Sequence, residues 1–290
     1  MHIVFHIGAH CTDNERLLRC LLRDASMLAE HNVAVPGQGR YRKLFRDTLE
    51  GLGEAEPKEG TRDLLLDAVL DGRIAERLVL SNPSFLCPPN RVFEEGQLYA
   101  MAGTRAKALG QIFAGDEITI FLGLRNPASF IPDVYAQSSG MAFLDFMGGT
   151  DPRQVRWSDL VARLHEALPR AQLVLWANED TPLIWGDILR RMAGTPDAAF
   201  AGEYDLMETI MTEDGMGRFR TYLAQRNITG TAQRRRVIAA FLDKYAVEEE
   251  VVEEVDLPGI DNALAAELTS AYEADCTKIA AMPGVDWIAP

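Results

Sequence analysis

Runs of consecutive apolar residues alternate with amphipathic stretches over the first two thirds of the chain. The apolar runs are short enough to be buried strands and cover residues 3–7, 32–37, 77–82, 117–124 and 172–178. Between them, apolar residues recur every three to four positions, which predicts helices over 14–30, 42–52, 61–72, 99–113, 156–168 and 181–194. Wholly apolar strands that alternate with helices predict an α/β fold of three layers: a mostly parallel sheet of about five strands with helices on both faces.

Helices dominate the sequence beyond about residue 200. We therefore expect one domain over 1–290, with an α/β core at 1–199 and a mostly helical C-terminal extension at 200–290. Two helix starts are marked by capping residues. Asn126 is a good N-cap before Pro127, and Thr181 can cap a helix that has Pro182 at its first position and ends at Gly194.

The composition of the chain argues against some classes of function. The formal net charge of −14 argues against general nucleic-acid binding, which needs a basic face. The charge is uneven, because 247–256 carries six carboxylates and no base whereas 234–236 reads RRR. We interpret the acidic run as a solvated surface. No apolar stretch approaches the ~20 residues of a membrane span, and the N-terminus lacks the pattern of a signal peptide, so a cytoplasmic protein is expected.

The loop after the first strand, HIGAHCTDNERLL, stands where many α/β proteins hold a phosphate. A nucleotide-binding Walker A loop needs a second glycine and a lysine. Here Gly8 is followed by Ala9, His10, Cys11 and Thr12, so ATP or GTP hydrolysis is disfavoured. A structural alternative is a capping box, in which Thr12 caps the helix and the Glu15 carboxylate folds back over its free N–H groups.

His10 is the candidate acid–base residue, because it follows a strand at the edge where ligands bind. His2, His6 and His10 are spaced by four, but on a strand and loop this spacing does not gather metal ligands, and the cysteines show no CxxC pair. No metal is expected. Cys11, beside a histidine at a helix start, is a possible nucleophile if its pKa is lowered, and otherwise an inert thiol.

Arg125 ends the fourth predicted strand and should project near His10. A guanidinium there suits a phosphate or sulfate group. The alternative, equally supported by the sequence, is that Arg125 pairs with a nearby carboxylate such as Asp133 or Glu179.

These segments together resemble the sulfotransferase family, which transfers a sulfuryl group from 3′-phosphoadenosine-5′-phosphosulfate. The resemblance is carried by four segments in the same order as in the family: HIGAHCTDNE, LRNPASFIPDVYAQ, LVLWANEDTPLIWGDILRRMAG and the closing LTSAYEADCTKIAAMPGVDWIAP. It implies a P-loop type fold, this nucleotide as sulfuryl donor, and a hydroxyl or amine acceptor on a small molecule or carbohydrate.

The resemblance also assigns the site residues and shows where they depart from the family. Gly8, Cys11, Thr12, Asn14, Arg125 and Asp133 occupy the donor-binding positions, with His10 as the catalytic candidate. The family's phosphate-binding lysine falls on Cys11, its hydroxyls fall on Asn14 and Glu15, and the serine that joins the 3′-phosphate arginine falls on Asp133.

Three functions follow from these residues. The first is an active sulfotransferase-like transferase, with Arg125 binding the donor and His10 acting as acid or base. The second is a catalytically inactive relative that has lost the nucleotide site and serves as a binding or scaffold protein. The third is an enzyme that uses Cys11 as nucleophile on a different ligand.

Overall fold

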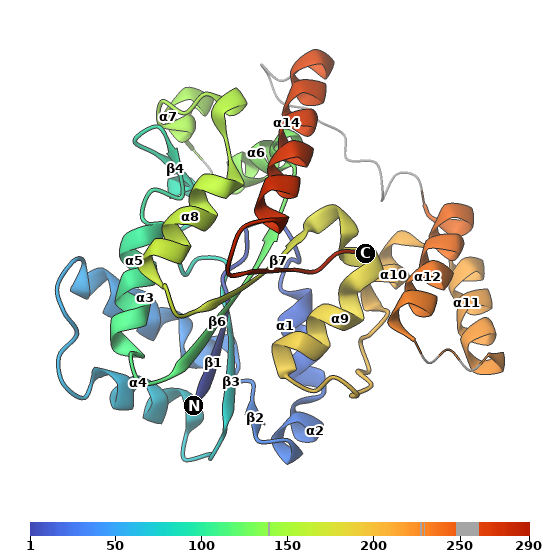
Figure 1. The fold of residues 1–290 in the computed structure, drawn as a ribbon, viewed down its shortest axis with the longest axis horizontal. Coiled ribbons are helices and arrows are strands. Elements are labelled where there is room, and N and C mark those ends of the chain that lie inside the picture. Colours follow the sequence, from blue (N-terminus) through green and yellow to red (C-terminus); the bar gives the residue numbers. More distant parts are fainter. Residues whose placement is uncertain (139, 227, 229, 248–260) are drawn as a thin grey trace.

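A computed structural model of the chain describes residues 1–138, 140–226, 228, 230–247 and 261–290. Six strands form one parallel sheet in the order β2-β3-β1-β6-β7-β8 (Figure 1). They are β1 (His2–His6), β2 (Val33–Ala34), β3 (Arg77–Ser81), β6 (Glu117–Leu124), β7 (Gln172–Ala177) and β8 (Val285–Trp287). A separate antiparallel pair joins β4 (Phe93–Glu94) to β5 (Gln97–Leu98).

Helices connect and cover the strands. The α-helices are α1 (Arg16–Arg23), α2 (Ala25–Glu30), α3 (Arg42–Leu52), α4 (Thr61–Leu70), α5 (Ala102–Ile112), α6 (Pro127–Ala136), α7 (Phe143–Met147), α8 (Trp157–Ala167), α9 (Thr181–Ala193), α10 (Asp205–Ile210), α11 (Glu213–Gln225), α12 (Thr231–Tyr245) and α14 (Asn262–Ala280). Short 3₁₀ turns lie at Gln38–Arg40, Pro89–Arg91, Pro152–Gln154 and Asn178–Asp180.

The sheet has a hydrophobic core on each face, because successive side chains of a strand point to opposite sides. Ile3 and Phe5 of β1 join the larger core, which contains residues of α3, α4, α5, α6, α8 and α14. Val4 joins a second core with residues of α1, α2 and α9. The fold is therefore the predicted three-layer α/β arrangement, with helices on both faces of a parallel sheet (Figure 1).

The sheet differs from the prediction in its size. All five predicted strands are present, although β2 is reduced to Val33–Ala34. The sixth, β8, pairs in parallel with β7 through Leu173–Val285, Val174–Asp286 and Leu175–Trp287, and closes the sheet at the C-terminus. Three residues after a long helix give too short a pattern to mark a strand.

Helix boundaries are confirmed in part. Asn126 caps α6 by accepting the N–H of Ala128, and Gly194 ends α9 with a positive φ. Thr181 was wrongly predicted as a cap: it is already helical, and its hydroxyl interacts with the Trp176 indole N–H at 3.2 Å. The predicted helix 14–30 is divided at Asp24 into α1 and α2.

The C-terminal helices fall into two groups. Helices α10–α12 gather around their own apolar cluster, which includes Met207, Met216, Phe219 and Ile238. Helix α14 instead packs against α6 and α8 beside the ends of β6 and β7. The acidic run 247–256 lies outside the described residues except for Val247.

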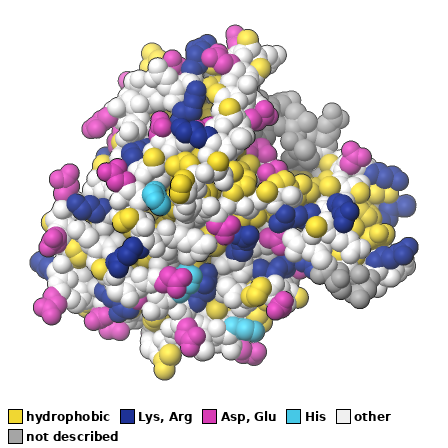
Figure 2. Space-filling view, viewed as in Figure 1, with side chains coloured by type: hydrophobic (Ala, Val, Ile, Leu, Met, Phe, Trp, Pro, Cys, Tyr) yellow, Lys and Arg dark blue, Asp and Glu magenta, His cyan; other side chains and the backbone are white. Residues whose placement is uncertain are grey.

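The surface of the described chain is mixed. Figure 2 shows acidic and basic side chains spread over one face, with apolar atoms gathered across its middle. Among the described helices, none combines the length and apolar character needed to cross a membrane.

Candidate functional site

The connections of the sheet mark one edge, between β1 and β6, where a ligand site is expected; this edge is called the crevice. From β1 the chain passes to β2 and β3 on one side, whereas from β6 it passes to β7 on the other. In open parallel sheets, ligands bind where adjacent strands diverge in this way, outside their carboxyl ends. The loop after β1 and Arg125 after β6 meet at this point, as the sequence analysis expected, because Arg125 contacts the Cys11 carbonyl.

Gly8 holds the first of these segments against the second. The Gly8 carbonyl accepts the N–H of Gly123 at 2.9 Å, and the Ala9 N–H donates to the Gly123 carbonyl at 3.0 Å. Gly8 has a φ of +109°, and a Cβ there would lie 3.1 Å from the His10 nitrogen and 3.3 Å from Pro83. A glycine is therefore required by the backbone path itself.

His10 lies inside the protein, with 2% of its surface exposed. The Tyr99 hydroxyl is 2.7 Å from His10 Nδ1 and also accepts the His10 backbone N–H at 3.2 Å. Nδ1 thus shares a hydrogen bond with this hydroxyl, and Nε2 faces Ser84 Oγ at 3.5 Å. Burial lowers the pKa of His10 to about 4, so the ring is neutral at physiological pH.

Arg125 is held by groups of the chain itself. Its Nη1 donates to the Cys11 carbonyl at 2.6 Å and forms an ion pair with Asp133 Oδ2 at 2.6 Å. The Arg125 side chain is 7% exposed, whereas Asp133 is 53% exposed at the rim. The carbonyl of Arg125 accepts the indole N–H of Trp157 at 2.9 Å, which fixes the backbone of Arg125 itself. Pairing with Asp133 was one of the two alternatives left open by the sequence.

The start of α1 is satisfied by Asp13, and the predicted capping box is wrong. Asp13 Oδ2 accepts the N–H of Leu17 at 3.0 Å. The Thr12 hydroxyl donates to the Ala9 carbonyl at 2.8 Å, and Glu15 forms an ion pair with Arg42 at 2.6 Å. Asn14 has a positive φ of 47°, and its carbonyl accepts from Arg19 at 2.8 Å. The carboxylate over the helix start is thus a different one from the one predicted.

A second set of polar groups at this edge was missed by the sequence analysis. Glu179 accepts the Asn126 backbone N–H at 2.8 Å and the Tyr272 hydroxyl at 2.7 Å. The Tyr272 hydroxyl also approaches the Leu124 carbonyl at 3.0 Å, and Asn126 Nδ2 donates to Thr269 at 2.8 Å. Helix α14 therefore closes one side of the crevice, and no local sequence signal links Tyr272 to a strand 148 residues away.

The Cys11 thiol does not have the lowered pKa that a nucleophile needs. Burial, together with the nearby Asp133 carboxylate, raises its pKa to about 12, against a smaller opposing effect of Arg125. The expected activation by a neighbouring histidine fails because His10 is buried and neutral. Among the described residues, no group of three or more metal-binding side chains gathers here or elsewhere.

We expect Cys11 to react slowly with iodoacetamide at neutral pH. A thiol with a pKa near 12 holds so little thiolate that its rate should fall about 100-fold or more below that of a free cysteine. Peptide mass spectrometry over a time course measures this, with urea-unfolded protein as the fast-reacting control. Rapid and selective labelling of native Cys11 would contradict the assignment and restore the nucleophile hypothesis.

Three cavities of 390–610 Å³, lined by described residues, lie away from the crevice. They are found between α11 and α12, between α5 and α8, and between α9 and α12. None of these three is lined by the Gly8–Asn14 loop or by Arg125.

Fold and site together define a three-layer α/β protein with polar side chains gathered at the divergence of β1 and β6. No model of a known protein family matches the chain, and no curated protein matches it either. A solved structure, the sulfotransferase domain from the curacin biosynthetic pathway, aligns with 94% of this chain and 97% of its own length, at 13% identity and a TM-score of 0.36. A superposition of this quality transfers no residue roles, so the crevice is interpreted from its own contacts.

Proposed function

We propose that this chain is a sulfotransferase-like protein that has lost the nucleotide donor site and acts as a binding or scaffold protein. The observation that carries the proposal is the ion pair between Arg125 and Asp133 at 2.6 Å, with the Cys11 carbonyl on the same guanidinium nitrogen. In the sulfotransferase reading, Arg125 is the residue that would bind the 3′-phosphate of the donor. The Asp133 carboxylate already neutralises the charge of Arg125.

The rest of the crevice opposes an anionic donor in the same way. Asp13 occupies a helix-start N–H that a phosphate would use. Cys11 is a neutral thiol at the position where the family has a lysine. Each charge-assisted hydrogen bond that is missing costs about 1.5–3 kcal/mol of binding free energy, and added carboxylates repel the phosphates further.

Sulfuryl transfer would also need a base for the acceptor. His10 is 2% exposed, its Nδ1 is engaged by Tyr99, and burial keeps its pKa near 4. A residue in this state neither reaches an acceptor hydroxyl nor gains a proton readily at neutral pH. We therefore favour binding over catalysis, with a small molecule or carbohydrate as the class of ligand inherited from the resemblance.

The test is thermal unfolding with and without millimolar 3′-phosphoadenosine-5′-phosphate at low salt. Ligand at ~100 times its dissociation constant would add about 2.7 kcal/mol of stability, a clear rise in Tm. We expect no such rise for the native chain. A rise that Arg125→Ala abolishes, and that Arg153→Ala (an exposed arginine paired with Glu267) leaves intact, would overturn the proposal and make an active transferase the better reading.

A further inference from the structure

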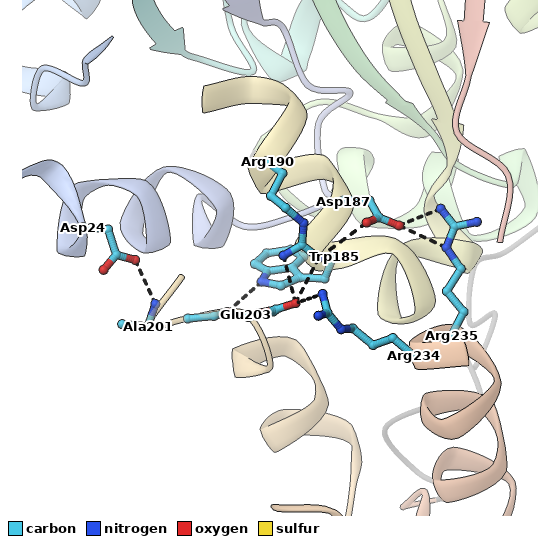
Figure 3. Close-up of polar contacts among 9 residues, drawn as sticks. Asp24, Trp185, Asp187, Arg190, Ala201, Glu203, Arg234 and Arg235 are labelled. Atoms are coloured by element: carbon cyan, nitrogen blue, oxygen red, sulfur yellow. Dashed lines mark hydrogen bonds and ion pairs between the residues drawn. The ribbon is translucent and has the colours of Figure 1, made fainter. Parts of the chain in front are cut away.

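A cluster of arginines and carboxylates joins α9 to α12 outside the crevice (Figure 3). Glu203 Oε1 accepts from Arg190 Nη1 at 2.9 Å and from Arg234 Nη1 at 2.7 Å. Asp187 Oδ2 accepts from Arg235 Nη2 at 2.6 Å and Nε at 3.0 Å. Arg190 links the two carboxylates, because its Nη2 also lies 3.5 Å from Asp187 Oδ1.

These side chains are poorly exposed. The side chains of Arg190 and Glu203 are 11% exposed, that of Asp187 is 14%, and those of Arg235 and Arg234 are 22% and 28%. Charges held in such surroundings are costly unless they are balanced by partners.

The balance in this cluster is positive. Three guanidinium groups (Arg190, Arg234 and Arg235) face two carboxylates (Asp187 and Glu203), which leaves an excess of one positive charge. Arg191 adds no excess, because it pairs with Asp286 at 2.6 Å. In a chain of formal net charge −14, this local excess is the reverse of the overall trend. Figure 2 shows basic side chains gathered over the part of that face formed by α9 and α10–α12.

A cavity opens directly on the cluster. It has a volume of about 390 Å³, and its lining includes Arg190, Arg191 and Arg235, with Asp187 and the Thr231 side of α12. Guanidinium groups therefore reach it from two different helices. Such groups bind phosphate oxygens in pairs, and their arrival from separate directions suits a tetrahedral phosphoryl group better than a planar carboxylate. The volume exceeds what a bare phosphate ion needs and leaves room for a small organic group.

We propose that the cavity between α9 and α12 binds a small phosphomonoester, whose phosphoryl group is attracted by the positively charged cluster and contacts the lining arginines Arg190, Arg191 and Arg235. Arg190 is fixed by Glu203, and Arg235 is fixed by Asp187 and by the Ala289 carbonyl, which accepts from Nη1, so both guanidinium groups are held in a set orientation. Arg191, which is 42% exposed and pairs with Asp286, forms the outer side of the site. Arg235, from the run RRR (234–236), thus has a role other than the solvated surface charge that a run of like residues ordinarily indicates.

The experiment is isothermal titration calorimetry of the full chain with ribose 5-phosphate and, separately, with inorganic phosphate. We expect ribose 5-phosphate to bind more tightly than inorganic phosphate, with ribose alone giving no signal. Arg191→Gln should weaken binding about 10-fold or more, because one charge-assisted contact is lost. Arg218→Gln, on neighbouring α11, is the matched control: it removes the same charge from an exposed pair with Asp214 and should leave binding unchanged.

Two results would overturn the proposal. One is the absence of binding of either phosphate at millimolar concentration, and the other is equal weakening by Arg191→Gln and Arg218→Gln, which would indicate general ionic attraction.

If Arg191→Gln does not fold, Thr231→Ala tests another residue that lines the same cavity. Arg125→Ala should leave this binding intact, so the outcome is independent of the crevice. Conversely, a nucleotide whose binding is lost in Arg191→Gln but kept in Arg125→Ala would occupy this cavity.

Discussion

Replacing Asp133 by serine and Cys11 by lysine should create an anion site in the crevice. Asp133→Ser removes the carboxylate that pairs with Arg125 at 2.6 Å. Cys11→Lys adds a cation where the thiol now lies protonated. With two charge-assisted contacts of about 1.5–3 kcal/mol each, the double variant should bind 3′-phosphoadenosine-5′-phosphate about 10²–10⁴-fold more tightly than the native chain.

The measurement is calorimetric titration of the native chain, both single variants and the double variant with this nucleotide. Adding Arg125→Ala to the double variant should remove the gain, because the Arg125 guanidinium is the main binding group. Asp145→Ser on α7 supplies a control of the same charge change away from the crevice. If the double variant binds no better than this control, occupation of Arg125 by Asp133 is not what prevents nucleotide binding, and the proposed loss of the donor site needs another cause.

The fold was predictable because its strands are buried on both faces. Ile3, Val4 and Phe5 are all fully buried, so β1 reads as an unbroken apolar run. The strand that was missed, β8, has only half-buried residues and depends on pairing with β7, more than 100 residues earlier in the chain. The break between α1 and α2 was not predicted, because the helical spacing of apolar residues continues across Asp24.

The sequence predicted where the candidate site lies in the fold, but not which ion pairs and hydrogen bonds its residues form. Asn126 and Pro127 mark the end of β6, which places Arg125 at the carboxyl edge of the sheet. Which carboxylate it meets depends on how α6 turns Asp133 toward it, and the sequence left Asp133 and Glu179 open. At the start of α1, Thr12 and Asp13 compete for the same donors, and the left-handed backbone at Asn14 and Glu15 favours Asp13.

The burial of His10 was the least predictable feature. Its partner Tyr99 is 89 residues away, at the first position of the predicted helix 99–113, and in the structure it lies just before α5. The ring planes of the two residues stack with centroids 5.7 Å apart. A histidine at the end of a strand is thus part of the core here, and this has a measurable consequence for stability.

Stability should fall as the pH is lowered from about 6.5 toward 4, and His10 should account for a large part of the fall. Above pH 6.5, His10 is neutral in both the folded and the unfolded chain. Between 6.5 and about 4 the unfolded chain takes up a proton that the folded chain excludes, because burial lowers the pKa of His10 to about 4. Below that value both states are protonated and the loss is complete. A shift of this size corresponds to about 3 kcal/mol.

Urea unfolding at several pH values tests this with His10→Gln, whose amide can still interact with the Tyr99 hydroxyl. Between about pH 7.5 and pH 4.5, the free energy of unfolding should fall by about 2–3 kcal/mol less in His10→Gln than in the native chain. Burial also lowers the pKa of His6, so the variant should keep part of the pH dependence. His31→Gln, at an exposed position, should follow the native curve. Parallel curves for His10→Gln and the native chain would mean that His10 takes up its proton in the folded state, as an accessible acid–base residue would, and the catalytic assignment of His10 would regain its basis.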